Sequence, residues 1–98
     1  MTKERIYTER EIEKYLTDRC KILGIETRKV KWVGHDAAPD RFLFVNGGVF
    51  VECKRPGESP RSNQELEFSR MSKAGCLVYV ADSKERVDYI LNAIKEES

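Results

Sequence analysis

The segment from residue 41 to residue 54 restricts the possible folds more than any other part of the chain. It reads RFLFV, then NGG, then VFVECK, so two runs of β-branched and aromatic residues flank a short polar turn. Asn and Gly tolerate the positive φ angles that a tight hairpin turn requires. The segment therefore predicts two adjacent antiparallel strands.

The length of the turn decides which side chains share a face of this hairpin. A two-residue turn at Asn46-Gly47 places Asp40 opposite Cys53 and directs it to the wrong face. A three-residue turn, with Gly48 as the left-handed residue of a bulge, places Asp40 opposite Lys54. The longer turn gathers on one face the residues that could do chemistry together, which are Asp40, Glu52 and Lys54.

Capping residues followed by helical periodicity predict helices before and after the hairpin. Thr8 and Glu11 have the spacing of a capping box and begin a helix over about residues 8 to 23. Ser62 and Glu65 have the same spacing and begin a second helix, which runs to the next glycine.

Two further strands and a last helix complete the predicted elements. Residues 25 to 33 alternate roughly between apolar and polar and predict a strand. The run CLVYVAD, residues 76 to 82, is continuously apolar, which is typical of a strand buried on both faces. Ser83 can cap a C-terminal helix. The order αβββαβα and a right-handed parallel crossover to the last strand predict a mixed four-stranded sheet in one α/β domain over residues 1–98.

Composition excludes several classes of protein. The 18 Lys and Arg residues nearly balance 17 Asp and Glu residues, so any DNA-binding surface needs segregated positive charge. No apolar run approaches a membrane span and the N-terminus lacks a hydrophobic signal region, so we expect a cytoplasmic protein. Cys20, Cys53 and Cys76 lack metal-ligand spacing and are expected to be reduced thiols in apolar surroundings.

Two carboxylates close together repel one another unless a cation lies between them. Oxygen ligands without His or Cys favour a hard ion such as Mg²⁺ or Mn²⁺. With Lys54 beside them, Asp40 and Glu52 could therefore support metal-assisted hydrolysis of a phosphodiester. From spacing alone, the alternative is that Glu52 and Lys54 form a weak ion pair on a solvated strand.

Four stretches together resemble a known superfamily. They are PD at residues 39–40, VECK at residues 51–54, Gln64 and GCLVYVAD at residues 75–82. The conjunction resembles the PD-(D/E)XK nucleases and, within them, the VRR-NUC family in the small stand-alone form carried by bacteriophages. The resemblance implies a restriction-endonuclease-like αβββαβ core, here followed by a C-terminal helix.

The resemblance also implies roles for individual residues. The catalytic lysine would be Lys54, and Gln64 would orient groups of the site or substrate. Glu11 would complete the acidic cluster, although its position also suits a helix cap without any catalytic role. The metal ligands implied are the carboxylates of Asp40, Glu52 and Glu11 and the backbone carbonyl of Cys53.

The implied activity is divalent-metal-dependent, structure-specific cleavage of branched DNA, of the Holliday-junction-resolving type, by a homodimer in the host cytoplasm. Cations beside the site are the expected phosphate contacts, and we select Arg55, Arg61 and Lys73. The alternative is a module on a nuclease fold that binds branched DNA or a protein without cutting. Two crowded acids favour the enzyme.

Overall fold

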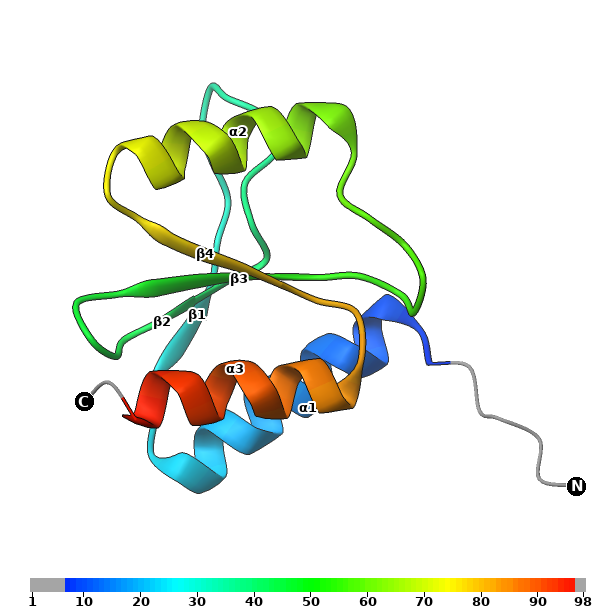
Figure 1. Ribbon diagram of the computed structural model, residues 1–98, viewed down its shortest axis with the longest axis vertical. Coiled ribbons are helices and arrows are strands. Elements are labelled where there is room, and N and C mark those ends of the chain that lie inside the picture. The colour runs from blue at the N-terminus through cyan, green and yellow to red at the C-terminus, as the bar shows by residue number, and fades with distance from the viewer. Residues whose placement is uncertain (1–6, 97–98) are drawn as a thin grey trace, which may run out of the picture.

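The computed structural model describes residues 7–96, and these form three helices around a mixed four-stranded sheet (Figure 1). The predicted order αβββαβα is confirmed. The elements are α1 (Glu9–Leu23), β1 (Thr27–Lys29), β2 (Arg41–Leu43), β3 (Val49–Cys53), α2 (Ser62–Lys73), β4 (Leu77–Ala81) and α3 (Lys84–Glu96). None of these described helices is both long and apolar enough to cross a membrane.

The sheet lies between two helical layers. Its strands follow the order β1-β2-β3-β4, with β1, β2 and β3 antiparallel and β4 parallel to β3. Figure 1 shows α1 and α3 on one side of the sheet and α2 on the other. The face toward α1 and α3 carries the hydrophobic core, whose strand members are Leu43, Val49, Val51, Cys53 and Ala81.

The first helix forms as its capping pattern predicts. Thr8 Oγ1 accepts a hydrogen bond from the backbone N–H of Glu11 at 3.1 Å, and Gly24 ends the helix with a φ of 75°. Ile12 and Leu16 are fully buried against the sheet. Burying an aliphatic side chain of this size contributes roughly 1.5–3 kcal/mol, so packing rather than propensity holds α1 in place.

The second capping box is not where the sequence predicted it. Helix α2 begins at Ser62 itself, so Arg61 is the residue before the helix and Gln64 is its third residue. Gln64 Oε1 accepts from the Arg61 N–H at 3.0 Å, which is the backbone contact expected of a capping-box side chain. The cap on α3 is confirmed, since Ser83 Oγ accepts from the Arg86 N–H at 3.0 Å.

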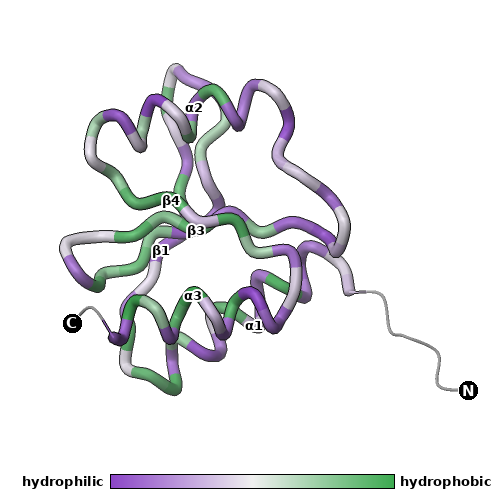
Figure 2. Tube along the Cα trace, viewed as in Figure 1, coloured by the Kyte–Doolittle hydropathy of each residue, from purple (hydrophilic) through white to green (hydrophobic). Residues whose placement is uncertain are grey.

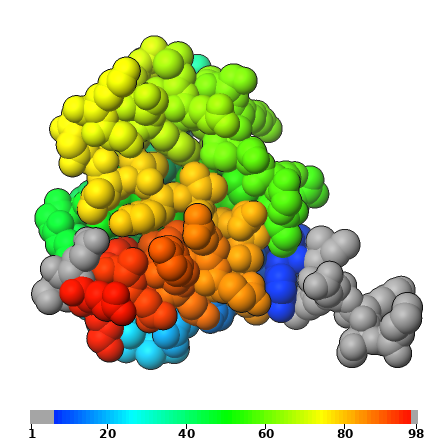
Figure 3. All heavy atoms as spheres, in the orientation of Figure 1, coloured from blue at the N-terminus to red at the C-terminus, as the bar shows by residue number. Residues whose placement is uncertain are grey.

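Strand β4 is an edge strand, although its apolar run predicted burial on both faces. No strand pairs beyond it among the described residues, and Leu77 is 42% exposed. Figure 2 shows apolar residues along β3 and β4, and Figure 3 shows residues of β4 reaching the surface between α2 and α3. An apolar sequence therefore indicated a strand correctly but not its position in the sheet.

The hairpin between β2 and β3 combines features of both predicted turns. The Gly48 N–H donates to Val45 O at 2.9 Å, which closes a two-residue turn at Asn46-Gly47. The strands then pair Leu43 with Val49, so one extra residue, Phe44, lies on the β2 side. The bulge is therefore at Phe44 and not at Gly48.

This register keeps the predicted faces but changes the partners. Arg41 pairs with Val51, and continuing by one residue places Asp40 across from Glu52. The predicted pairing of Asp40 with Lys54 was therefore wrong by two residues along β3. A shift of two residues leaves every side chain on its original face, so the acids still meet.

Gly48 is required by the aromatic packing behind the turn. Its φ is 109°, and a Cβ at this position would lie 2.5 Å from Cζ of Phe42. Gly47 also has a positive φ, 81°, but a Cβ there would meet nothing within 4 Å. A substitution at Gly47 would therefore cause backbone strain alone, whereas one at Gly48 would cause both strain and steric overlap.

We expect Gly48→Ala to lower the free energy of unfolding by roughly 2–4 kcal/mol, because strain and overlap with the Phe42 ring add. Gly47→Ala is the matched control and should lose only about 1–2 kcal/mol from strain. Urea unfolding of both variants measures the difference. Equal losses would show that the Phe42 ring moves aside freely.

Candidate active site

Asp40 lies where the loop after β1 enters β2, and one backbone contact fixes it. Its Oδ2 accepts a hydrogen bond from the Cys53 N–H at 2.8 Å. The acid is therefore attached to the end of β3, directly beside Glu52. Burial and the Asp40 charge raise the pKa of the Cys53 thiol, so this thiol is not a nucleophile near neutral pH.

Glu52 is a carboxylate in the interior of the protein, with only 2% of its surface exposed. Its Oε2 accepts from Gln64 Nε2 at 2.8 Å and lies 3.2 Å from Lys54 Nζ. Its Oε1 is buried without a hydrogen-bond partner among the described residues. A buried carboxylate oxygen left without a partner is costly in a protein interior and points to a missing ligand.

The Lys54 ammonium is almost as buried as its partner, with 7% of the residue exposed. Burying one charge with an opposite charge lowers the penalty that either would incur alone. Glu52–Lys54 is therefore not the solvated surface ion pair that spacing alone allowed. The pair lies on the floor of a cleft.

A third acid approaches from α1, and it is not the expected one. One carboxylate oxygen each from Glu9, Asp40 and Glu52 lies within 4.8 Å of the other two. The Glu11 carboxylate instead bonds the backbone N–H of Thr8 at 3.4 Å and its hydroxyl at 3.3 Å. Residues two apart on a helix point about 200° apart, so only one of the two glutamates can face the sheet.

Glu9 was missed, although the sequence carried a signal for it. It precedes the buried Ile12 by three residues and the buried Leu16 by seven, so it continues the same helical stripe. Glu11 lies off this stripe. Glu11 was predicted from the family resemblance and from its place at the margin of the stripe, whereas Glu9 lies in line with the buried residues.

Gln64 makes two contacts from one side chain. Its carbonyl oxygen accepts from the Arg61 N–H and its amide nitrogen donates to Glu52 Oε2. The start of α2 is thereby joined to the C-terminal part of β3. The predicted role of orienting site groups fits this geometry.

A cleft of about 380 Å³ opens above these groups. It is lined by the acidic cluster, Lys54 and Gln64, together with residues that the sequence did not single out, namely Asp36, Ala37 and Asn63. Ala37 has a φ of 71°, a left-handed conformation that is unfavourable for a non-glycine residue. Backbone strain of this kind is concentrated at functional sites.

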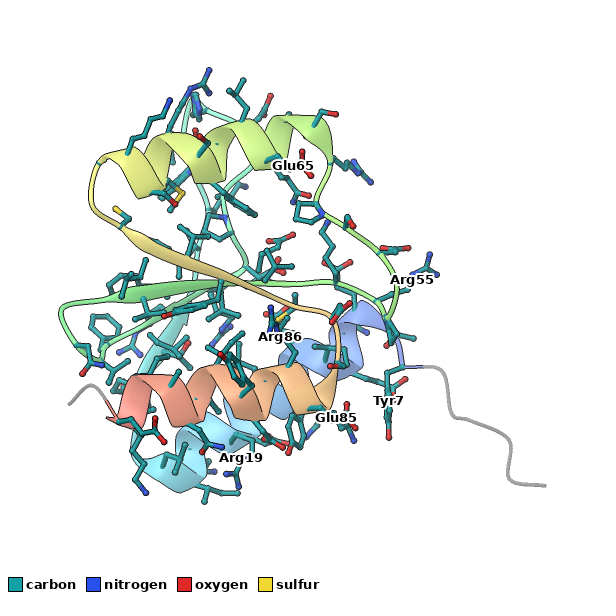
Figure 4. The ribbon with its side chains drawn as sticks, in the orientation of Figure 1. Tyr7, Arg19, Arg55, Glu65, Glu85 and Arg86 are labelled. Atoms are coloured by element: carbon teal, nitrogen blue, oxygen red, sulfur yellow. The ribbon has the colours of Figure 1, made fainter. Side chains whose placement is uncertain are left out.

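The three cations predicted to contact DNA lie at different places. Arg61 lines the cleft. Figure 4 shows Arg55 on the loop between β3 and α2, directed away from the protein body, where it pairs with Glu58. Lys73 ends α2, nine residues after Gln64 or about 13 Å along the helix, and does not line the cleft.

The site's electrostatics depend on the protonation of Glu52. Burial first, and then the Asp40 charge, raise the pKa of Glu52 from 4.5 to about 7, although Lys54 and Gln64 oppose the shift. The folded protein therefore holds this proton more tightly than the unfolded chain does. This contribution to stability is complete below about pH 4.5 and disappears as the pH rises through about 7.

We expect the free energy of unfolding of the wild type, relative to Glu52→Gln, to fall by on the order of 3 kcal/mol between pH 4.5 and pH 8. Urea unfolding in EDTA measures both proteins. Glu65→Gln, which changes an exposed glutamate on α2, is the matched control and should follow the wild type. Parallel curves for wild type and Glu52→Gln would contradict the raised pKa.

Comparison with known proteins identifies the family of this chain. No family model matches the chain. A protein named "Putative nuclease p44", from Acyrthosiphon pisum secondary endosymbiont phage 1, is 36% identical over 83 residues, which are 83% of this chain and 89% of the phage protein. A solved structure described as a VRR_NUC domain is 32% identical, with a TM-score of 0.79, and the match covers 88% of this chain and 97% of that one. The predicted resemblance is confirmed, and the chain belongs to the VRR-NUC family of nucleases.

Proposed function

We propose that this protein is a divalent-metal-dependent DNA endonuclease that hydrolyses phosphodiester bonds in branched DNA, acting as a homodimer on four-way junctions. The observation that carries the proposal is the buried, unpartnered Oε1 of Glu52 within an acidic cluster beside Lys54. A structural carboxylate would have its oxygens satisfied, whereas a metal ligand requires one oxygen to remain available.

The donor set fits a hard divalent cation. Glu9, Asp40 and Glu52 would hold it, together with the Cys53 carbonyl that the family resemblance implies. All of these are oxygen donors, which suit Mg²⁺ or Mn²⁺. When bound, such an ion supplies a water of lowered pKa and neutralises charge on the phosphate.

The chain's own residues prepare this chemistry. Gln64 and Lys54 contact one oxygen of Glu52 and leave the other without a partner among the described residues. The Lys54 ammonium, held 3.2 Å from Glu52, provides a fixed positive charge beside the position of the scissile phosphate. Arg61, at the edge of the cleft, is placed to contact a neighbouring phosphate.

The choice between Glu9 and Glu11 can be tested by metal binding without any DNA. We expect Glu9→Gln to weaken Mn²⁺ binding about ten-fold or more, because it removes one member of the cluster. Glu11→Gln should keep wild-type affinity and nearly wild-type stability with or without Mn²⁺, because Gln in a capping box can still accept a hydrogen bond from the Thr8 N–H. Calorimetric Mn²⁺ titration and thermal unfolding measure the two effects. Weaker binding by Glu11→Gln alone would return the ligand role to Glu11.

The activity itself is tested with labelled four-way junction, flap and linear duplex in Mg²⁺ or Mn²⁺. We expect the wild type to cut the branched substrates, and Asp40→Asn and Lys54→Ala to lose at least about 100-fold in rate, as removal of a transition-state contact does. Asp18→Asn is a matched control, because Asp18 pairs with Lys14 on an exposed face of α1. Binding of the junction without cutting in either metal would instead indicate a non-cleaving module.

Dimerisation is tested by a separate measurement. The described residues of one chain form one acidic cluster, whereas two symmetric nicks require two active sites. Sedimentation at micromolar concentration, with and without junction DNA, should show two protomers. Monomers that cut each strand independently would contradict paired resolution while leaving the nuclease assignment intact.

A further inference from the structure

A second hollow adjoins the catalytic cleft and has no part in the chemistry proposed above. Its volume is about 320 Å³, and it lies between the loop at residues 34–37 and the first turns of α2. Asp36, Ala37 and Asn63 line both this hollow and the cleft. The two hollows therefore share part of their walls, and a nucleotide strand held in the cleft could extend into the second hollow.

The charges around this hollow do not suit a phosphate. Two carboxylates, Asp36 and Glu67, face one guanidinium, Arg70, and one imidazole, His35. Burial opposes ionisation of Glu67, which is 8% exposed, but hydrogen bonding to His35 and the His35 charge outweigh it and hold the Glu67 pKa below its usual value. The two carboxylates balance the charges of His35 and Arg70, so the hollow offers no net positive charge to an anionic group.

The same walls suit an uncharged planar heterocycle. Leu66 is 54% exposed beside Ala37 and offers an apolar surface to a ring face. Asn63 and Arg70 supply hydrogen-bond donors, and Glu67 supplies acceptor oxygens. Apolar contact combined with a few convergent polar groups is the pattern of a small-ligand pocket.

The position of Glu67 is held from two sides. His35 Nε2 lies 3.1 Å from Glu67 Oε1, and Arg70 Nη1 lies 3.6 Å from the same oxygen. His35 also ties the loop to α2, so the two walls of the hollow keep a defined separation. The pocket is thus preorganised in the protein without DNA, which lowers the entropy that binding would otherwise cost.

We propose that this hollow binds one unpaired nucleobase of the DNA strand next to the scissile phosphate, with its ring against Leu66 and its edge on Asn63, Glu67 and Arg70. This inference rests on the proposed nuclease function and deepens it. A paired base enters such a pocket only by leaving its stack, which costs free energy, so the site favours strands whose pairing is weakened or interrupted, as near a branch point. The loop at residues 34–37 is then a specificity element.

The test scans a branched substrate with single abasic nucleotides around the cleavage position. We expect the wild type to lose roughly ten-fold in cleavage rate at one position and little elsewhere, about the effect of leaving two methylene groups unburied. Leu66→Ala should cut the intact substrate roughly ten-fold more slowly than the wild type does. On the substrate that is abasic at the sensitive position, Leu66→Ala and the wild type should cut at the same rate. Ile22→Ala, at another exposed aliphatic position on a helix, is the matched control and should keep the wild-type pattern.

A binding measurement keeps this inference separate from catalysis. Asp40→Asn protein, with and without Leu66→Ala, is titrated with the same oligonucleotides by fluorescence anisotropy. We expect the abasic nucleotide at one position to weaken binding when Leu66 is present and to have little effect when it is replaced by Ala. Cleavage by the wild type with no sensitive position would overturn the base pocket and leave the nuclease intact. If the protein does not cut but Leu66 and one nucleotide still contribute jointly to binding, only the catalytic proposal is overturned. If neither cleavage nor binding depends jointly on Leu66 and one nucleotide, the base pocket is overturned.

Discussion

The burial of the Glu52 carboxylate is the constraint on which the rest of the site depends. A charge in the middle of a sheet loses its hydration, and Asp40 beside it adds repulsion. Lys54 and Gln64 offset part of this penalty at one oxygen and leave the other oxygen bare. A chain selected only for stability would place an apolar residue here, so the retained cost indicates a function.

Secondary structure could be predicted wherever a local pattern determines it. The Thr8 cap, the Asn-Gly turn and the Ser83 cap all depend on residues within three or four positions of one another. The hairpin register does not, because the extra residue at Phe44 accompanies the packing of the Phe42 ring over Gly48. Such packing depends on tertiary contacts that no local pattern contains.

Only the part of the candidate site that lies on the hairpin could be predicted from a local pattern. Asp40, Glu52 and Lys54 share a face in any register that differs by an even number of residues, so an incorrect partner still gave the correct cluster. The contribution of α1 required knowing how the helix is rotated against the sheet. The buried positions Ile12 and Leu16 define that rotation, and they point to Glu9.

Gln64 links the beginning of a helix to the interior of a strand, and this has a consequence for how the protein loses its site on heating. Helix ends open more readily than the strands of a core, often without global unfolding. When the first turn of α2 frays, the amide that restrains Glu52 departs with the backbone of Arg61. We therefore expect Glu52 to lose this restraint at a lower temperature than the one at which the core strands unfold.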